Sequence, residues 1–299
     1  MLNMPFSDRI AARLSYSMFE RDGTIENIYT GNDIDGRDAY GIRLSVDFDI
    51  SETTKLEFTH DRSETEDNRQ NIGIIVCEPH PVFGCSPLER GTFGQSADTR
   101  GSTAALFNFI AGLNSTADSN SYAGINALGS LEKVNINRDP EHHQVFEFTM
   151  LELNHDISDE LQLVVKGTYS TRDYYHMGDN DYNVAVNPFP GLFPPGHPAA
   201  AIPMQWTGCF GGEGYGFCEI IDSDRTYEFA VVESETRQLE ATLVSNLDGP
   251  INFVAGLYHY DFTTNNTYQV QTASWNLISD GALHPYNVPL FGGALTGSG

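Results

Sequence analysis

Four cysteines lie in two closely spaced pairs, so thiol chemistry is the first possibility that the residue types raise. Cys77 and Cys85 enclose a segment with proline and glycine, and Cys209 and Cys218 enclose a glycine-rich one. This spacing favours two local disulfides that staple loops in an oxidising compartment. The alternatives are free thiols, or a metal site made by Cys77, His80 and Cys85. A zinc site, however, usually takes four ligands and tighter Cys spacing.

Two other patterns are candidates for cation binding. Residues 179–183 read Asp-Asn-Asp-Tyr-Asn, like the start of an acidic calcium loop, but Val184 stands where Gly is expected and Pro190 where the final Glu is expected. We therefore expect a solvated loop there. His142 and His143 are adjacent, and adjacent strand residues point to opposite faces, so they make a poor chelate. No metal site is predicted.

The sequence carries no strong catalytic motif. The glycine-rich segment 211–216 carries no Lys and follows no strand-to-helix pattern, which argues against a phosphate loop. Neither G-x-S-x-G nor H-E-x-x-H occurs. The sequence therefore predicts no catalytic residue, no cofactor and no enzyme. A secreted glycan hydrolase or lyase stays a third hypothesis, because two carboxylates brought together by the fold would suffice.

The elements that position these residues are predicted to be β-strands. Apolar and polar residues alternate with period two in segments of about ten to fourteen residues, which is typical of strands. In residues 144–157 the apolar set changes phase between Met150 and Leu151, and we expect a β-bulge there. Seven strands are predicted, within residues 9–20, 38–50, 55–61, 144–157, 161–169, 239–243 and 251–259.

The connections between these strands alternate in length. Three short turns lie at residues 51–54, 156–160 and 247–250. The other connections hold about 15, about 75 and nearly 60 residues, and short turns on one rim with long loops on the other are typical of an outer-membrane barrel. Within the longest, residues 102–113 could form a short helix capped at Ser102. A soluble sandwich also alternates polar and apolar faces, but its loops need not sort by rim.

The positions of charged and aromatic side chains along the predicted strands also favour a barrel. We expect a polar lumen face that carries both Arg43 with Asp47 and Asp49, and Arg237 with the preceding Glu233 and Glu235. The alternative is the solvated outside of a sheet. Aromatic residues gather at strand ends, where barrels meet the membrane–water interface; they are Tyr169, Tyr174, Tyr175, Tyr258, Tyr260 and Phe262.

Composition limits the partners and the compartment. The 16 Lys+Arg and 41 Asp+Glu give a net charge of −25, which argues against nucleic acid as a partner. The longest apolar run, near residues 104–113, is about half of the ~20 residues that a spanning helix needs. The first 14 residues show no cationic segment followed by an apolar core. Disulfides would conflict with a cytoplasmic location, so we expect a truncated N-terminus.

Several segments together resemble the mid-barrel of TonB-dependent outer-membrane receptors. They are PFSDRIAARLSY at residues 5–16, Asp22-Gly23, TGNDIDGRDAY at 30–40, LELNHDISDEL at 151–161, SETRQLE at 234–240 and SNLDGPINFVAGLY at 245–258. In order, they cover the strand-forming part of the chain from about residue 5 to residue 262.

The resemblance implies an all-β fold: antiparallel up-and-down strands forming part of a transmembrane outer-membrane β-barrel with long external loops. It implies a Gram-negative outer membrane and energised uptake of a ferric siderophore, a cobalamin or a glycan. The partners would be outer-membrane lipid, a small ligand such as a metal chelate, and an inner-membrane energy-coupling complex reached through a plug.

The chain departs from the family pattern in two ways. We see neither a plug before the strands nor a terminal aromatic strand, so residues 1–299 are expected to be a partial barrel domain without plug and C-terminal strands. Such barrels close with roughly 22 strands, and seven cannot close. The alternative is a secreted all-β binding domain whose acidic, disulfide-stapled loops hold a cation or a glycan. No ligand-contact residue is predicted.

Overall fold

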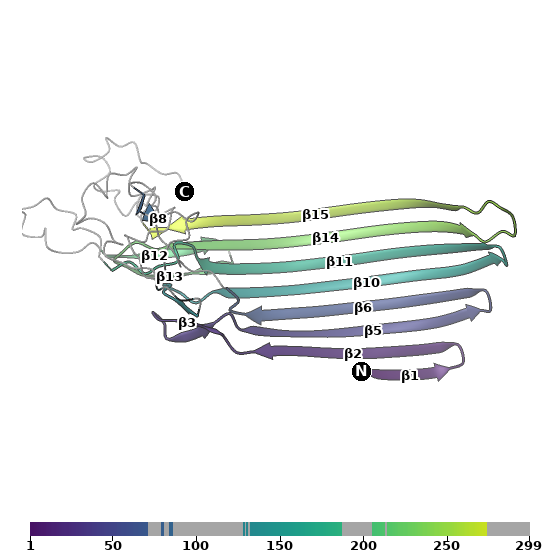
Figure 1. Cartoon of the computed structure of the whole chain (residues 1–299), viewed down its shortest axis with the longest axis horizontal. Coiled ribbons are helices and arrows are strands. Elements are labelled where there is room, and N and C mark those ends of the chain that lie inside the picture. Colours follow the sequence, from purple (N-terminus) through teal and green to yellow (C-terminus); the bar gives the residue numbers. More distant parts are fainter. Residues whose placement is uncertain are drawn as a thin grey trace, which may run out of the picture.

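The main element of the molecule is one antiparallel sheet of eight strands. The computed structural model describes residues 1–70, 132–186, 205–212 and 214–273, with the isolated positions 79–80, 84–85, 128 and 130. The strands lie in the order β1-β2-β5-β6-β10-β11-β14-β15 (Figure 1). Their bounds are β1 Leu2–Ser7, β2 Ile10–Arg21, β5 Arg37–Ser51, β6 Thr54–Asp67, β10 Glu141–Ser158, β11 Leu161–Asp179, β14 Thr226–Ser245 and β15 Val254–Thr272.

The sheet is built up and down, because each strand pairs with the sheet strand that precedes it along the chain. Short turns join β1 to β2, β5 to β6, β10 to β11 and β14 to β15, all at one end of the sheet (Figure 1). We call this the turn end and the opposite end the loop end. All seven predicted strands and the three predicted turns are confirmed, and β1 is an additional strand.

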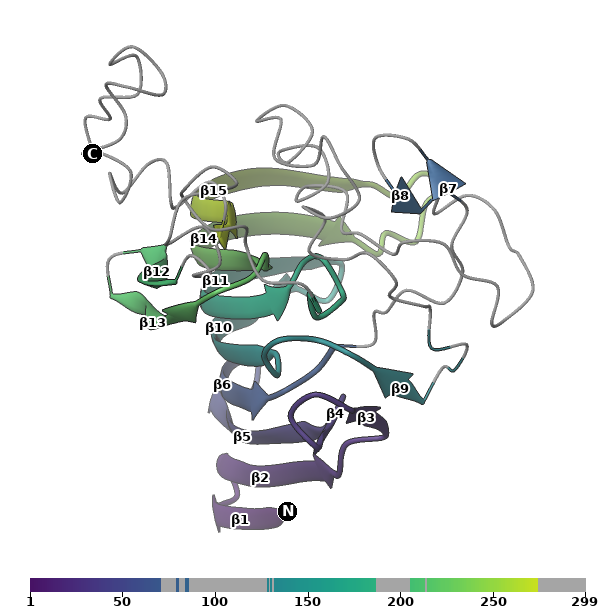
Figure 2. The ribbon, with the colours of Figure 1, turned by 90° about the vertical axis from the view of Figure 1, so that its left-hand side faces the viewer.

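Smaller strands gather at the loop end. β3 (Ile25–Asn27) pairs with β4 (Asn32–Ile34) and with β9 (Lys133–Val134), and β12 (Trp206–Gly212) pairs with β13 (Tyr215–Ile221). β7 (Pro79–His80) pairs with β8 (Gly84–Cys85). Figure 2 looks at this end and shows the β12–β13 hairpin and β9 on opposite sides of the stacked strands. No helix in the part of the chain that the structure describes is long and apolar enough to cross a membrane.

The packed interior also lies at the loop end. One cluster joins the ends of β11 and β14 to the β12–β13 hairpin, through Met177, Tyr227, Phe229, Phe210, Ile221 and Ala273. A second cluster holds the small β3–β4–β9 sheet together, through Ile25, Ile34, Val134 and Ile136. The largest fully buried side chains of the described residues come from this end of the molecule. The long central part of the sheet therefore contributes little to a conventional core.

The predicted bulge between Met150 and Leu151 is wrong. Pairing of β10 with β11 is unbroken from Glu141 to Asp156, and the register shifts only between Asp156 and Ser158, beside the turn. The apolar residues change phase because the two sets belong to different faces of a regular strand.

Candidate functional site

One face of the sheet carries a row of apolar side chains from seven successive strands. Directly paired residues of neighbouring strands point to the same face, so the register defines the row. Its members are Ile10, Phe48, Leu56, Leu153, Val165, Ala241 and Leu257. The next row toward the loop end adds Val46, Phe58, Leu151 and Leu239. We call these side chains the apolar band, and the side of the sheet that carries them the band face.

Much of the apolar band is open to solvent. Leu257 is 80% exposed, Leu239 52% and Leu151 49%. Soluble monomers rarely expose apolar surface that continues over so many strands, and such surfaces usually meet a membrane or another protein.

The opposite side of the sheet, which we call the polar face, is charged at the same height. The row Asp47, Glu57, Glu152, Lys166 and Glu240 runs across five neighbouring strands behind the apolar band. Within it, Lys166 Nζ lies 2.8 Å from Glu152 Oε2. Ions of this density require water on their side of the sheet. The two faces therefore call for two different environments.

Toward the loop end, the height of the apolar surface differs between strands. On β2 and β5 apolar side chains continue as far as Met18 and Tyr40, whereas in the same row β14 already carries Glu233. On β15 the first acidic residue of the band face is Asp261, two rows closer to the turn end. The apolar surface is thus taller on β2 and β5 than on the other strands, because β6 already carries Arg62 and Glu64 beside Ile42 and Tyr40.

Arg237 lies on the band face, above the apolar band, and the prediction that it shares a lumen face with Arg43 is wrong. Arg43 pairs across the sheet with Asp61, 2.7 Å away, and its row continues to Thr236, not to Arg237. Arg237 forms an ion pair with Glu235. Arg237 and Leu239 are two residues apart in β14, so their side chains point to the same face, the band face.

Tyr258, Tyr260 and Phe262 stack along the polar face of β15. Their ring centroids follow one another at 6.4 Å, with interplanar angles of 13° and 16°. Because Leu257 and His259 occupy the other phase, these three aromatic residues do not belong to a girdle on the band face.

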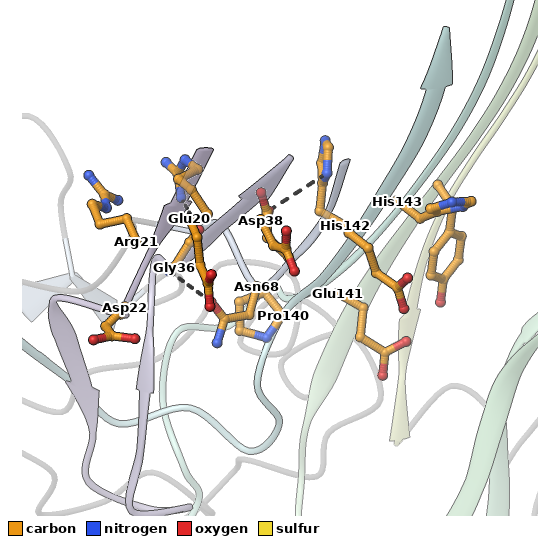
Figure 3. A pocket seen from close by; sticks show the side chains of 15 residues that line it. Glu20, Arg21, Asp22, Gly36, Asp38, Asn68, Pro140, Glu141, His142 and His143 are labelled. Atoms are coloured by element: carbon orange, nitrogen blue, oxygen red, sulfur yellow. Dashed lines mark hydrogen bonds and ion pairs between the residues drawn. The ribbon is translucent and has the colours of Figure 1, made fainter. Parts of the chain in front are cut away.

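A cleft of about 750 Å³ opens at the loop end of β2, β5, β6 and β10. Six of its fifteen lining residues are acidic: Glu20, Asp22, Asp38 and Glu141, which Figure 3 labels, together with Glu66 and Asp67. At one side Arg21 and Arg37 share the carboxylate of Asp35, at 3.0 and 2.9 Å, so Asp35 balances one of their two positive charges. The remaining carboxylates make the cleft favourable for cationic groups.

His142 and His143 both line this cleft, and they point in different directions (Figure 3). This agrees with the expectation that they do not chelate one ion together. His142 Nδ1 lies 3.8 Å from Asp67 Oδ1 and has no hydrogen-bond partner among the residues that the structure describes. Burial lowers the pKa of His142 to about 4, and the positive charge of Arg69 acts in the same direction. The imidazole is therefore neutral at pH 7.

Sequence reasoning missed the histidine that does lie beside His142. It is His176 on β11, the direct cross-strand partner of His142 on the polar face. His176 Nε2 lies 3.6 Å from Glu228 Oε1. Only the register of the β10–β11 hairpin could have revealed this pair.

The expected solvated loop at residues 179–183 is instead buried. Asp179 and Asp181 are fully buried, and Asn183 is nearly so. The two oxygens of Asp179 accept backbone hydrogen bonds of 2.8 Å, Oδ2 from Asn137 and Oδ1 from Tyr182. Burial raises the pKa of Asp179 to about 7. Over the described ranges no three His, Cys, Asp or Glu side chains are placed to hold a metal ion.

A disulfide joins Cys209 and Cys218, as predicted, across the β12–β13 hairpin. Of the glycine-rich segment, Gly211 and Gly212 pair with Gly216 and Tyr215 near the tip of that hairpin, and Gly216 has a positive φ of 114°. The other predicted pair cannot be compared, because Cys77 and the side chain of Cys85 lie outside the described residues, as do residues 102–113.

Comparisons with known proteins find distant structural similarity only. No family model and no curated protein matches the chain. The siderophore receptor PiuA from Acinetobacter baumannii is similar at 10% identity and a TM-score of 0.35, over 88% of this chain and 43% of that one. The ferric yersiniabactin uptake receptor FyuA from Yersinia pestis is similar at 9% identity and a TM-score of 0.35, over 90% and 40%. The ferric-catecholate import receptor Fiu from E. coli is similar at 12% identity and 0.34, over 91% and 35%.

This chain therefore spans less than half the length of each of these receptors. Identities and TM-scores at this level do not identify an activity or a ligand for it.

Proposed function

We propose that the chain forms part of the wall of a TonB-dependent receptor barrel in the outer membrane of a Gram-negative bacterium. The observation that carries this proposal is the exposed apolar band, backed at the same height by a charged face. A single-layer sheet with these two surfaces suits a boundary between lipid and a wet interior.

The dimensions of the apolar band support a lipid contact. On β5 the apolar side chains of the band face continue from Phe48 to Tyr40, which at ~3.3 Å per residue is about 26 Å along the strand. The lipid-facing zone of outer-membrane barrels is about 25 Å tall. Strands in such barrels are tilted by ~35–45°, so a horizontal membrane cuts obliquely across them. Along strands tilted in this way, about 26 Å of strand corresponds to roughly 20 Å of membrane height, so the apolar surface of β5 covers most of this zone.

The arrangement of the sheet supports a partial wall. β1 and β15 each pair with one neighbour only among the described residues, and β15 offers an edge of 19 residues. Closure of a receptor barrel takes roughly 22 strands. Residues 1–299 are thus assigned to a partial barrel domain, and the plug and the remaining strands belong to the intact receptor.

In that receptor the function is energised uptake of a scarce ligand, such as a ferric siderophore, a cobalamin or a glycan. Turn ends would face the periplasm, where an inner-membrane energy-coupling complex acts through the plug. Loop ends would face outward, and the acidic cleft lies at that end. The polar face would line the lumen.

The orientation of the strands provides the test. An epitope is inserted in the β3–β4 turn at residues 28–31 or, in a second variant, in the β5–β6 turn at residues 52–53, with the chain directed to the outer membrane of a Gram-negative host. The first epitope should be detected on intact cells, and the second only after the outer membrane is permeabilised. Equal detection of both, or recovery of the chain as a stable soluble monomer, would refute the proposal.

A further inference from the structure

We propose that His142 and His176 form a binding site for a divalent transition-metal ion, such as Cu²⁺ or Zn²⁺, on the polar face at the loop end of the sheet. The site does not depend on the membrane assignment, because it follows from the β10–β11 register alone.

The register brings the two imidazoles together. His142 and His176 are direct cross-strand partners, and such partners have Cβ atoms about 4.5–5.5 Å apart on one face. Two imidazoles at this separation can both reach a single ion with ring nitrogens about 2.0–2.1 Å from it. His143, one position away, lies on the opposite face and cannot join them.

Each imidazole has a carboxylate on its outer side. Asp67 Oδ1 lies 3.8 Å from His142 Nδ1, and Glu228 Oε1 lies 3.6 Å from His176 Nε2. Histidines that bind metals commonly direct their second N–H to a carboxylate, which orients the ring and raises its basicity. In this arrangement His142 Nε2 and His176 Nδ1 are the nitrogens left for the metal. Four consecutive strands of the sheet thus supply Asp67, His142, His176 and Glu228 in order.

Neighbouring side chains hold the carboxylate of Glu228 beside His176. Glu228 also accepts hydrogen bonds from Tyr268 Oη, at 2.7 Å, and from Asn180 Nδ2, at 3.0 Å, so its carboxylate is held in position. A Cβ at position 178 would lie 3.1 Å from Gln70 Nε2 and 3.3 Å from His176 Nε2, so the glycine there allows both side chains to approach the backbone of β11 closely.

An ion can reach the site, and it would keep free coordination positions there. The side chain of His142 is 7% exposed, but it lines the acidic cleft, which gives an ion a route to it. Two protein ligands leave the other coordination positions to water or to donor atoms of an arriving molecule.

The test is a Cu²⁺ titration of the full chain followed by electron paramagnetic resonance. We expect one equivalent of Cu²⁺ whose spectrum shows two imidazole nitrogens, and Zn²⁺ should displace it. His142→Ala and His176→Ala should each remove this signal. The matched control is His143→Ala, which should leave it unchanged. Asp67→Asn and Glu228→Gln keep both imidazoles and should weaken binding by roughly 10–100-fold.

Several outcomes would overturn the proposal: no two-nitrogen signal in the unaltered chain, a signal that survives His176→Ala, or equal weakening by His143→Ala. Far-UV circular dichroism checks the fold of each variant. If His142→Ala does not fold, the spectrum of the unaltered chain and the His176→Ala titration decide the question.

Discussion

Ile10 of β2 and Leu257 of β15 lie in one row of cross-strand partners, on the same face of the sheet. Five other apolar side chains stand between them, one from each intervening strand. A row of this length is unexpected for a sheet whose faces both meet water, because each apolar side chain left in water forgoes roughly 1.5–3 kcal/mol of burial free energy. The functional proposal depends on this row, because it shows that the band face is apolar across seven strands.

A charge placed in the apolar band should destabilise the membrane-inserted form. Leu151→Arg is expected to reduce its free energy of unfolding by about 2–4 kcal/mol, because an Arg near the middle of the bilayer loses its hydration. Urea titration of the chain in lipid vesicles measures the effect.

The matched control for that change is Met150→Arg, one residue away on the polar face. It should cost clearly less, since its guanidinium remains in water. Equal losses from the two substitutions would show that the faces do not differ in environment.

The carboxyl group of Asp179 should titrate near neutral pH. Its folded-state pKa, about 7, is raised above the ordinary value of 3.8, so the folded chain binds more protons than the unfolded chain between these values. The contribution to stability is therefore largest below about pH 4 and declines as the pH rises to about 7. The amide proton shifts of Asn137 and Tyr182, which donate to this carboxyl, should follow the titration.

Asp179→Asn should abolish that titration. A midpoint near pH 4 in the unaltered chain would instead mean that water reaches the carboxyl, and would contradict the burial of this loop.

The β12–β13 hairpin should depend on its aromatic anchor at least as much as on its disulfide. Phe229 is fully buried against the hairpin, and Phe229→Ala is expected to cost about 3–5 kcal/mol. Replacing both Cys209 and Cys218 by Ser should cost about 2–4 kcal/mol. Limited proteolysis within residues 205–221 reports the opening of the hairpin.

As a control for the anchor, Phe262→Ala removes a ring that is 51% exposed on the polar face, and it should leave the hairpin resistant to protease. A hairpin that stays closed in Phe229→Ala would show that the cluster does not hold it.

Gly216 should tolerate no side chain. Its φ is 114°, and a Cβ would lie 2.1 Å from the carbonyl oxygen of Phe210. Gly216→Ala should therefore break the pairing of Gly211 with Gly216 and increase proteolysis of the hairpin. Gly249 has open space and no positive φ, so Gly249→Ala is the comparison and should have little effect.

The sheet could be predicted from the sequence where the two faces differ in polarity. Around Phe48 and Leu56 the alternation is strong, and the predicted strands are confirmed there. Toward the loop end both faces become polar, so β6 was predicted only to Asp61 although it continues to Asp67. β1 was not predicted because it contains Pro5, which a strand accepts when it lies at the edge of a sheet.

The faces and the cross-strand pairs were harder to predict. The charge of Arg237 suggests a position on the lumen face, whereas its spacing of two residues from Leu239 places it on the band face. The pairing of His142 with His176 depends on the register shift between Asp156 and Ser158. Continuing the Ser158–Leu161 pairing without that shift would place His143 opposite His176. A one-residue irregularity beside a turn leaves no mark in the periodicity of the strand.

The most direct measurement of the central claim is the depth of two neighbouring positions in a bilayer. Leu239→Trp and Gln238→Trp place a fluorophore on the band face and on the polar face of β14, in a chain whose own Trp206 and Trp275 are replaced by Phe. In vesicles of brominated lipid, we expect strong quenching of the Leu239→Trp fluorophore and little quenching of the Gln238→Trp fluorophore. Equal quenching at both positions, or none at Leu239→Trp, would contradict a lipid-facing apolar band.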